Sequence, residues 1–509
     1  MNKKGYEVVG AIVIRPNNLE LTIAELRGDG GKNILEELVQ PTNIGSDVFQ
    51  TGRIHAATIS DTVLHIKGFK KAMDNYQVKT YKAVATSAFR EAENQEYVLE
   101  RIRMNTGIVV DVANSAQERF YMHKALRYGL PKVGKTVESA LVVNVGSGGV
   151  EFSIYQKGNL MMTEYINIGA LRLHEQLSTF QTRTTEFLRV MEEFISSRLS
   201  IVKPIINKAD IQYFIGLGSE LNMVAGLISA KKKLIDIVEI ENLYEKIKRM
   251  QDEEIMEAYR MSAKQVETLV PTFVILNSFL GMTHSKKVYI PKIDFRQGIV
   301  CDLADSIFDL ERQEEFNRDI ISSVWYLAKK YGIDRQHSSQ VAKVAMKIYD
   351  QTEKYHQLGK RERQYLEIAA MLHAIGYFVN FNDYNVITSW LVKRQNIMGI
   401  SNLEMEIISS IIFYHEDEVP RQHHTVYTNL SHEEKAIVLK LTAILKIANS
   451  LDYSRGGKVS DIEICRKKDE LILTVKASQN LLLEEWVFNK RAEFFEEVMG
   501  IHPVLKIMM

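Results

Sequence analysis

Cysteine is scarce in this chain of 509 residues, which contains only Cys301 and Cys465. Two cysteines so far apart exclude a disulfide framework, and without CxxC spacing they predict neither a zinc site nor a redox site. Proline is also sparse, with 8 residues beside 28 glycines. This composition is typical of globular proteins and excludes the collagenous and disordered classes.

Long hydrophobic runs and net charge are lacking as well. No stretch of about 18 or more apolar residues occurs, so we expect no membrane span. The opening segment MNKKGYEVVGAIVIRPNN lacks a small-residue cleavage pattern and predicts a first β-strand rather than a signal peptide, which favours a cytoplasmic protein. Lys plus Arg and Asp plus Glu are each 64, so no overall field attracts nucleic acid or an anionic membrane. A polyanionic ligand would need local binding groups.

The order of predicted elements divides the chain into four domains. Short β-branched runs alternate with helical stretches in 1–127 and again in 128–309, which predicts two βββαβα-like halves with a ligand cleft between them. Long helical periodicities follow in 310–455, and a hairpin, a helix and a last strand in 456–509. The predicted fold class is α/β for the two halves, followed by an all-α domain and a small α+β cap.

The most informative segment is LVVNVGSGGVEFSIY, residues 141–155. An apolar strand leads into a glycine turn and a second strand returns, so backbone N–H groups can converge there and cradle a phosphate. A permissive β-hairpin turn is an equal alternative. The segment is neither a Walker A loop nor a GxGxxG turn before a helix.

Two other segments place polar side chains where a helix begins. In AVATSAFREAEN, residues 83–94, the hydroxyls of Thr86 and Ser87 and the guanidinium of Arg90 could form an anion site. In VANSAQERFYMHKAL, residues 112–126, Glu118 follows a strand-to-helix turn. The simpler alternatives are a helix cap with a solvated arginine, and a first-turn glutamate favoured by the helix dipole.

Taken in order, these segments resemble the exopolyphosphatase and guanosine pentaphosphate phosphatase family, a branch of the actin-like superfamily. ATSAFREAEN is similar to the family's ATSALRxAxN, NSAQERF to SGxEEAR, and NVGSGGVEF to DIGGGSTEL. Three shorter segments also match: NIGALRL at 167–173, GLGS at 216–219 and DFRQGIV at 294–300. The resemblance implies two actin-like (ribonuclease H-like) domains in tandem.

The resemblance also implies an activity: Mg²⁺-assisted attack of water on the terminal phosphoanhydride of inorganic polyphosphate or guanosine pentaphosphate. Glu118 matches the catalytic glutamate that acts on the water. The positions that match phosphate-binding groups are Arg90, Thr86, Ser87, Ser147, Gly148, Gly149 and Asn17, and those that match the metal region are Glu151 and Asn144.

The first phosphate loop departs from the family pattern. The family has DIGSNS where this chain has VIRPNNLEL, so Val13 replaces an aspartate and Arg15 and Pro16 replace glycine and serine. Asn144 replaces a second aspartate and Arg119 a second glutamate. These losses remove carboxylates that Mg²⁺ prefers, although Arg15 could itself neutralise substrate charge.

Three functional hypotheses follow. The first is an exopolyphosphatase. The second is a catalytically weakened homologue that binds polyphosphate or a guanosine alarmone as a sensor or regulator. The third, and least favoured, is an actin-like ATPase.

The helical region resembles the HD phosphohydrolase domain through RQHSSQVAKVA, AAMLHAIGYF and FYHEDE, which contain His337, His373 and His415. Ala374 stands where an HD site needs aspartate, so we expect an HD-like scaffold whose histidines are satisfied helix or interface residues without a catalytic metal. Glu416 and Asp417 are predicted to lie in a solvated turn. By resemblance, this domain would lengthen the binding groove and build a homodimer.

Overall fold

The computed structural model describes residues 5–129, 139–157, 159–181, 186–291, 293–308, 310, 312–395, 397–416, 425–467 and 470–508. The chain forms two compact units, 1–320 and 321–509, and the division falls inside one helix, α15 (Arg312–Lys330). The four predicted domain boundaries stay predictions.

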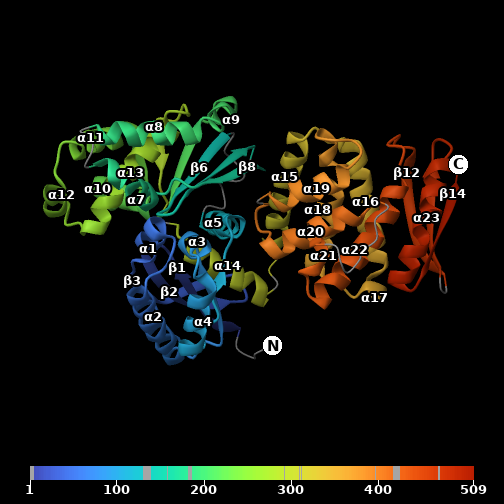
Figure 1. The fold of residues 1–509 in the computed structure, drawn as a ribbon, viewed down its shortest axis with the longest axis horizontal. Helices are drawn as coiled ribbons and strands as arrows, with labels where there is room; N and C mark the ends of the chain where they lie inside the picture. The colour runs from blue at the N-terminus through green and yellow to red at the C-terminus, as the bar shows by residue number, and fades with distance from the viewer. Residues whose placement is uncertain are drawn as a thin grey trace. The chain divides into compact units, whose positions relative to one another are not determined.

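The first half of unit 1–320 is built on a mixed five-stranded sheet with the order β3-β2-β1-β4-β5 (Figure 1). Its strands are β1 (Tyr6–Ile14), β2 (Asn18–Arg27), β3 (Lys32–Pro41), β4 (Thr80–Ala85) and β5 (Asp111–Val112). The first three pair antiparallel, and β4 and β5 continue parallel to β1. The last six residues of β1 are buried, as expected of a central strand covered on both faces.

The second half repeats this plan in a sheet with the order β10-β11-β9-β6-β7-β8. Its strands are β6 (Ser139–Val145), β7 (Val150–Gln156), β8 (Asn159–Ile166), β9 (Tyr213–Leu217), β10 (Leu234–Asp236) and β11 (Lys287–Tyr289). Again three antiparallel strands are extended by two parallel ones, with β10 added at the edge. The predicted internal duplication is therefore confirmed.

Helices surround both sheets. The first half contains α1 (Ile44–Thr51), α2 (Ala56–Asn75), α3 (Ser87–Glu91), α4 (Gln95–Thr106) and α5 (Ser115–Gly129). The second contains α7 (Ala170–Gln181), α8 (Phe187–Leu199), α9 (Lys203–Lys208), α10 (Ser219–Ile228), α11 (Ile237–Ile247), α12 (Asp252–Tyr259), α13 (Ala263–Leu280) and α14 (Phe295–Phe308). Among these described helices, none combines the length and the hydropathy that crossing a membrane requires.

Helix α14 packs on α5 and on strands β1, β2 and β4 of the first sheet. A side chain at Gly298 would place its Cβ 1.9 Å from the carbonyl oxygen of Tyr121, so only glycine permits this close approach. Two ion pairs reinforce it, because Lys124 Nζ lies 2.8 Å from a carboxylate oxygen of Asp302 and 2.8 Å from one of Asp305. Helix α5, which carries Glu118, is thereby held in a fixed position.

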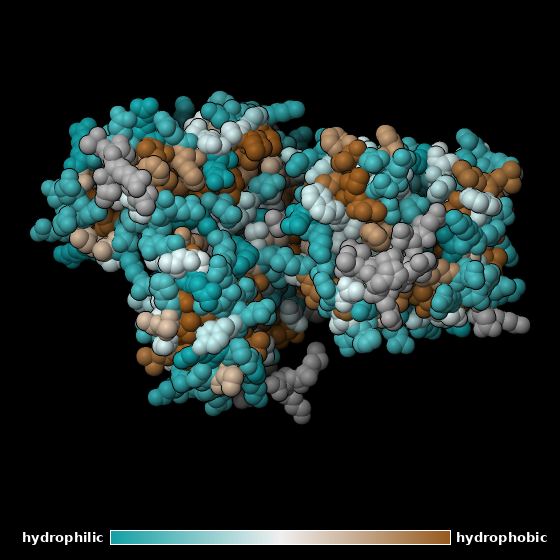
Figure 2. All heavy atoms as spheres, viewed as in Figure 1, coloured by the Kyte–Doolittle hydropathy of each residue, from teal (hydrophilic) through white to brown (hydrophobic). Residues whose placement is uncertain are grey.

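Unit 321–509 is helical first and mixed at its end, as predicted. Its helices after α15 are α16 (Arg335–Gln351), α17 (Glu353–His356), α18 (Lys360–Leu372), η1 (Ile375–Phe378), α19 (Tyr384–Lys393), α20 (Asn402–Tyr414), α21 (Thr425–Thr428) and α22 (His432–Ser450). The cap contains β12 (Val459–Lys467), β13 (Glu470–Ala477), α23 (Leu482–Met499) and β14 (His502–Met508), with β14 parallel to β13. On the visible face of each unit, hydrophobic residues form small patches among hydrophilic ones (Figure 2).

Candidate phosphate-binding site

The first loop joins β1 to β2 through Arg15, Pro16 and Asn17. Val13, in the position of the expected aspartate, is fully buried in the core. Arg15 Nε donates to Glu20 Oε2 at 3.2 Å and Arg15 Nη2 to Asp294 Oδ1 at 3.2 Å, so carboxylates of this chain already engage the guanidinium. The altered loop is therefore a closed, internally paired turn.

The second loop, residues 146–149, joins β6 to β7 and requires glycine at two close approaches. A Cβ at Gly148 would lie 2.0 Å from Ser87 Oγ, and one at Gly149 would lie 2.2 Å from the hydroxyl oxygen of Tyr165. The start of α7 supports this loop, since the backbone N–H groups of Ala170 and Arg172 donate to carbonyl oxygens in it, each at 3.0 Å.

The two loops meet. Asn17 Nδ2 donates to Ser147 Oγ at 3.2 Å, and Ser87 packs on Gly148. Thr86 is tied to the first strand, because its backbone N–H and its hydroxyl both donate to the carbonyl oxygen of Ile14, at 3.0 and 3.2 Å. The structure thus gathers the segments that the sequence predicted as phosphate-binding, although their roles stay predictions.

Glu118 and Arg90 form a direct pair. Arg90 Nη1 donates to Glu118 Oε1 at 2.5 Å and to the carbonyl oxygen of Ala113 at 2.7 Å. Burial lowers the pKa of Arg90, but Glu118, Tyr165 and Glu91 together outweigh burial and raise that pKa above its ordinary value. Arg90 also lies over the ring of Tyr165, the residue that covers Gly149, at 5.7 Å. This ring connects the ion pair to the second loop.

The two residues predicted to lie in the metal region, Asn144 and Glu151, are hydrogen-bonded to each other. Asn144 Nδ2 donates to Glu151 Oε2 at 3.4 Å. Burial raises the pKa of Glu151 to about 7, against a smaller opposing effect of Arg119. A carboxyl group must lose its proton before it can bind a metal ion. Among the described residues there is no cluster of three or more His, Cys, Asp or Glu side chains suited to a metal ion.

Glu220 lies where the third glycine turn meets the other two, and sequence reasoning missed it. Ser147 Oγ donates to Glu220 Oε1 at 2.5 Å and Ser219 Oγ to Glu220 Oε2 at 2.5 Å. Gly218 has φ of +102°, and a Cβ there would lie 2.2 Å from the carbonyl oxygen of Val145. The available signal was the glutamate that directly follows the GLGS motif.

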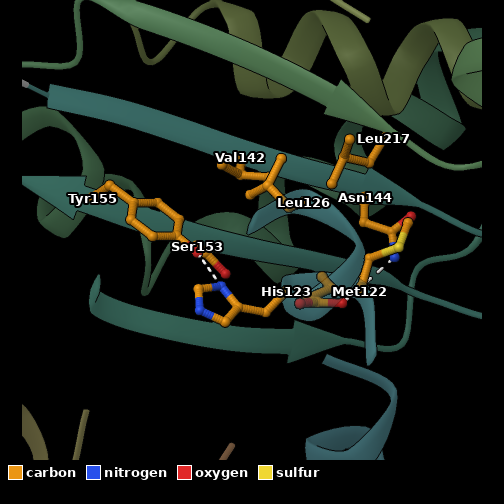
Figure 3. Close-up of a pocket in the computed structure, with 9 residues that line it drawn as sticks. Met122, His123, Leu126, Val142, Asn144, Ser153, Tyr155 and Leu217 are labelled. Carbon is orange, nitrogen blue, oxygen red and sulfur yellow. Dashed lines mark hydrogen bonds between the residues drawn. The ribbon is translucent and has the colours of Figure 1, made fainter. Parts of the chain in front are cut away.

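A second missed cluster lies beside Asn144 and Glu151, around a cavity of about 10 Å³ (Figure 3). The Tyr155 hydroxyl donates to His123 Nδ1, and His123 Nε2 lies 2.7 Å from Asp319 Oδ2. Arg127 completes the cluster with two contacts of 3.0 Å to Asp319. Because a carboxylate only accepts, Nε2 carries the proton of the neutral ring, and Nδ1 is left to accept from the phenol. This cluster connects α5 to α15.

In the helical unit, His337, His373 and His415 are buried next to one another. His337 Nε2 lies 3.1 Å from His373 Nε2, and His337 Nδ1 lies 2.8 Å from Asp452 Oδ2. His373 and His415 donate their Nδ1 protons to backbone carbonyl oxygens, at 2.8 and 2.6 Å. The expectation that these histidines are satisfied within the helices is confirmed.

The predicted solvated turn at Glu416 is wrong. Its carboxylate accepts from the hydroxyl of Tyr384, from Asn449 Nδ2 at 3.2 Å and from Arg491 Nη2 at 2.8 Å. Buried donors on three other elements draw this side chain inward, which residue spacing does not reveal. Asp417 lies outside the described residues.

The two sheets of like order, extended by a helical unit and a small cap, define an actin-like α/β protein with added C-terminal domains. Residues 23–307 match the model of the Ppx/GppA phosphatase family, and residues 321–490 match domain III of Ppx/GppA phosphatases. The chain belongs to the Ppx/GppA phosphatase family.

Individual relatives are distant. The chain is 21% identical over 425 residues to a guanosine-5'-triphosphate,3'-diphosphate pyrophosphatase of Vibrio parahaemolyticus, a match that covers 80% of each chain. Its sequence is 25% identical to that of an Aquifex aeolicus Ppx/GppA family member with a crystal structure. The two structures match with a TM-score of 0.50 over 59% of this chain and 99% of the other. The chain also shares its fold with an exopolyphosphatase from Cytophaga hutchinsonii, to which it is 18% identical. That structural match has a TM-score of 0.54 and covers 59% of this chain and 98% of the other.

Proposed function

We propose that this protein is an exopolyphosphatase that releases the terminal phosphate of inorganic polyphosphate by attack of water. The observation that carries the proposal is the convergence of Ser87, Ser147 and the Arg90–Glu118 pair around the second glycine loop. Hydroxyl, guanidinium and backbone N–H donors suit a phosphoryl group, and a carboxylate beside them suits a water molecule that must lose a proton.

Phosphate binding and the chemical step are coupled in this arrangement. Arg90 contacts Glu118 directly, so a phosphate oxygen that approaches Arg90 displaces part of that contact and frees Glu118 to accept a proton from water. Since Mg²⁺ keeps several waters and is commonly bound through one or two carboxylates together with substrate phosphates, we propose that it enters as the counter-ion of the phosphate chain, as part of the substrate. Guanosine pentaphosphate, which also ends in a phosphoanhydride, is the second substrate to test.

Phosphate release from long-chain polyphosphate with Mg²⁺ tests the proposal. We expect release by the wild type and a loss of about 10²- to 10⁴-fold in Glu118→Gln, because the amide accepts no proton. Glu100→Gln is the matched control, since Glu100 also pairs with an arginine, Arg103, but on the exposed face of α4. Equal release by the wild type and Glu118→Gln would refute the assigned role of Glu118.

A binding or sensing function is the second candidate, and one observation favours it. Arg15 is held by Glu20 and Asp294, and the buried Val13 supplies no polar group to the first loop. Tight polyphosphate binding without phosphate release, unchanged in Glu118→Gln, would support this candidate over the hydrolase.

A further inference from the structure

Glu220 brings a carboxylate to the meeting point of the three loops. Its side chain lies just behind the surface, with the residue 4% exposed, and each of its oxygens accepts one hydroxyl proton, from Ser147 and from Ser219. Ser147 also accepts from Asn17 at 3.2 Å. The Ser147 hydroxyl, which the sequence predicts to bind phosphate, therefore already donates to a carboxylate.

Glu220 also acts on the first loop. Burial lowers the pKa of Arg15, but the carboxylates of Glu20, Asp294 and Glu220 together raise it above its ordinary value. One carboxylate thus influences all three turns, through hydrogen bonds to two of them and through charge on the other.

The ion pairs around these loops leave no surplus of positive charge. Arg172 pairs with Glu91 at 2.6 Å, and Arg296 pairs with Asp294 at 2.9 Å and with Glu20 at 3.2 Å. Among the described side chains, five guanidinium groups stand against five carboxylates, with the partly protonated Glu151 beside them: Arg15, Arg90, Arg119, Arg172 and Arg296 against Glu20, Glu91, Glu118, Glu220 and Asp294. A bare polyanion gains little from such a site.

We propose that Glu220 determines the ionic form of the ligand: the site accepts a phosphate chain that carries a divalent cation and rejects the bare chain. A carboxylate repels phosphate oxygens at close range, whereas a hard cation attracts both sets of oxygens and cancels the repulsion. Val13 and Asn144 provide no carboxylate, and most of the other carboxylates around the loops are paired with arginines. Glu220 is instead held by two hydroxyl groups, so we assign this role to Glu220. The inference rests on the proposed function, since it presumes a ligand of the polyphosphate class.

A purely structural role for Glu220 predicts something different. If Glu220 only tied Ser147 to Ser219, Gln would preserve much of the bonding and leave the ionic preference of the site unchanged. If the charge of Glu220 matters, the two variants should differ in ionic preference: Glu220→Gln loses the charge and should lose the preference, whereas Glu220→Asp keeps both. Glu100→Gln again serves as the control, because it removes one negative charge from an exposed position.

The test is isothermal titration calorimetry of the full chain with tripolyphosphate, in EDTA and in Mg²⁺. For the wild type, Glu220→Asp and the Glu100→Gln control, we expect affinity to rise about tenfold or more when Mg²⁺ replaces EDTA. For Glu220→Gln, we expect metal-free affinity to rise about tenfold and the gain from Mg²⁺ to shrink accordingly.

Two results would overturn the inference while leaving the proposed function in place. One is wild-type binding that is equally tight in EDTA and Mg²⁺, a measurement that does not depend on any variant folding. The other is a Glu220→Gln variant that keeps the full Mg²⁺ requirement. Absence of tripolyphosphate binding by every form in both buffers would instead overturn the proposed function itself, and this inference with it.

Discussion

Gly148→Ala tests whether the second glycine loop and α3 pack as closely as the structure shows. The new Cβ would lie 2.0 Å from Ser87 Oγ, 2.9 Å from Ser87 Cβ and 3.3 Å from a ring carbon of Phe49. Rotation of the serine hydroxyl relieves the first contact only, because the second involves a carbon fixed to the backbone. Overpacking of this kind costs about 1 to 3 kcal/mol.

The choice of assay follows from the sequence. All three tryptophans, Trp325, Trp390 and Trp486, lie in unit 321–509, so tryptophan fluorescence follows that unit, while circular dichroism and calorimetry report on both. The calorimetric transition of unit 1–320 is the one that tryptophan fluorescence does not follow. We expect Gly148→Ala to lower the midpoint temperature of that transition by about 2 to 5 °C.

Two controls make the result interpretable. Gly68→Ala in α2 adds the same methyl group where nothing lies within 4 Å, and should stabilise by up to about 1 kcal/mol through helix propensity. In a Ser87→Gly background, which removes the clashing atoms, the cost of Gly148→Ala should shrink by about 1 kcal/mol. Stability of Gly148→Ala equal to the wild type, or an equal cost in both backgrounds, would refute the close packing of the two segments.

Three further predictions concern buried polar and charged side chains. Because the folded state raises the pKa of Glu151 from 4.5 to about 7, unfolding releases its proton more readily as pH rises between those values. Wild-type stability should therefore fall over that range relative to Glu151→Gln in urea titrations followed by circular dichroism, and parallel curves would contradict the assignment. In the cap, Glu484 is fully buried and its carboxylate oxygens lie 3.0 and 3.2 Å from Lys458 Nζ. Glu484→Ala should destabilise unit 321–509 by about 2 kcal/mol in tryptophan-monitored unfolding, and an unchanged midpoint would show that the pair contributes nothing. Tyr155→Phe removes the proton donor of His123 Nδ1 and should cost about 1 kcal/mol by calorimetry, whereas a neutral effect would show that the bond to Asp319 suffices.

Hydropathy patterning predicted the strands and helices in which buried residues alternate with exposed ones or follow one another without interruption. The strands at Tyr6–Ile14 and Val150–Gln156 and the glycine turn between the latter and its partner lie where the sequence placed them. Strand β3 was not placed from its own residues, because its sequence KNILEELVQP belongs to a largely exposed edge strand with two glutamates in its centre.

The candidate site was predictable in its parts but not in its pairings. Motif order identified the loops around Ser87 and Gly148, but spacing along the chain does not show that Arg90 contacts Glu118, 28 residues away. Glu220 went unnoticed because a glutamate in the first turn of a helix is ordinary. Asp319 reaches His123 across 196 residues, a separation at which local sequence carries no information about contact.

The repeated strand order gives the altered first loop a counterpart within the same chain. Hairpin β1–β2 and hairpin β6–β7 occupy equivalent places in their sheets, and their turns meet in the hydrogen bond between Asn17 and Ser147. The second turn contains three glycines, whereas the first contains Arg15 and Pro16. The second turn is therefore a template for redesigning the first, and a transplant of GSGG into the first hairpin would show how much of the site's behaviour depends on Arg15 and Pro16.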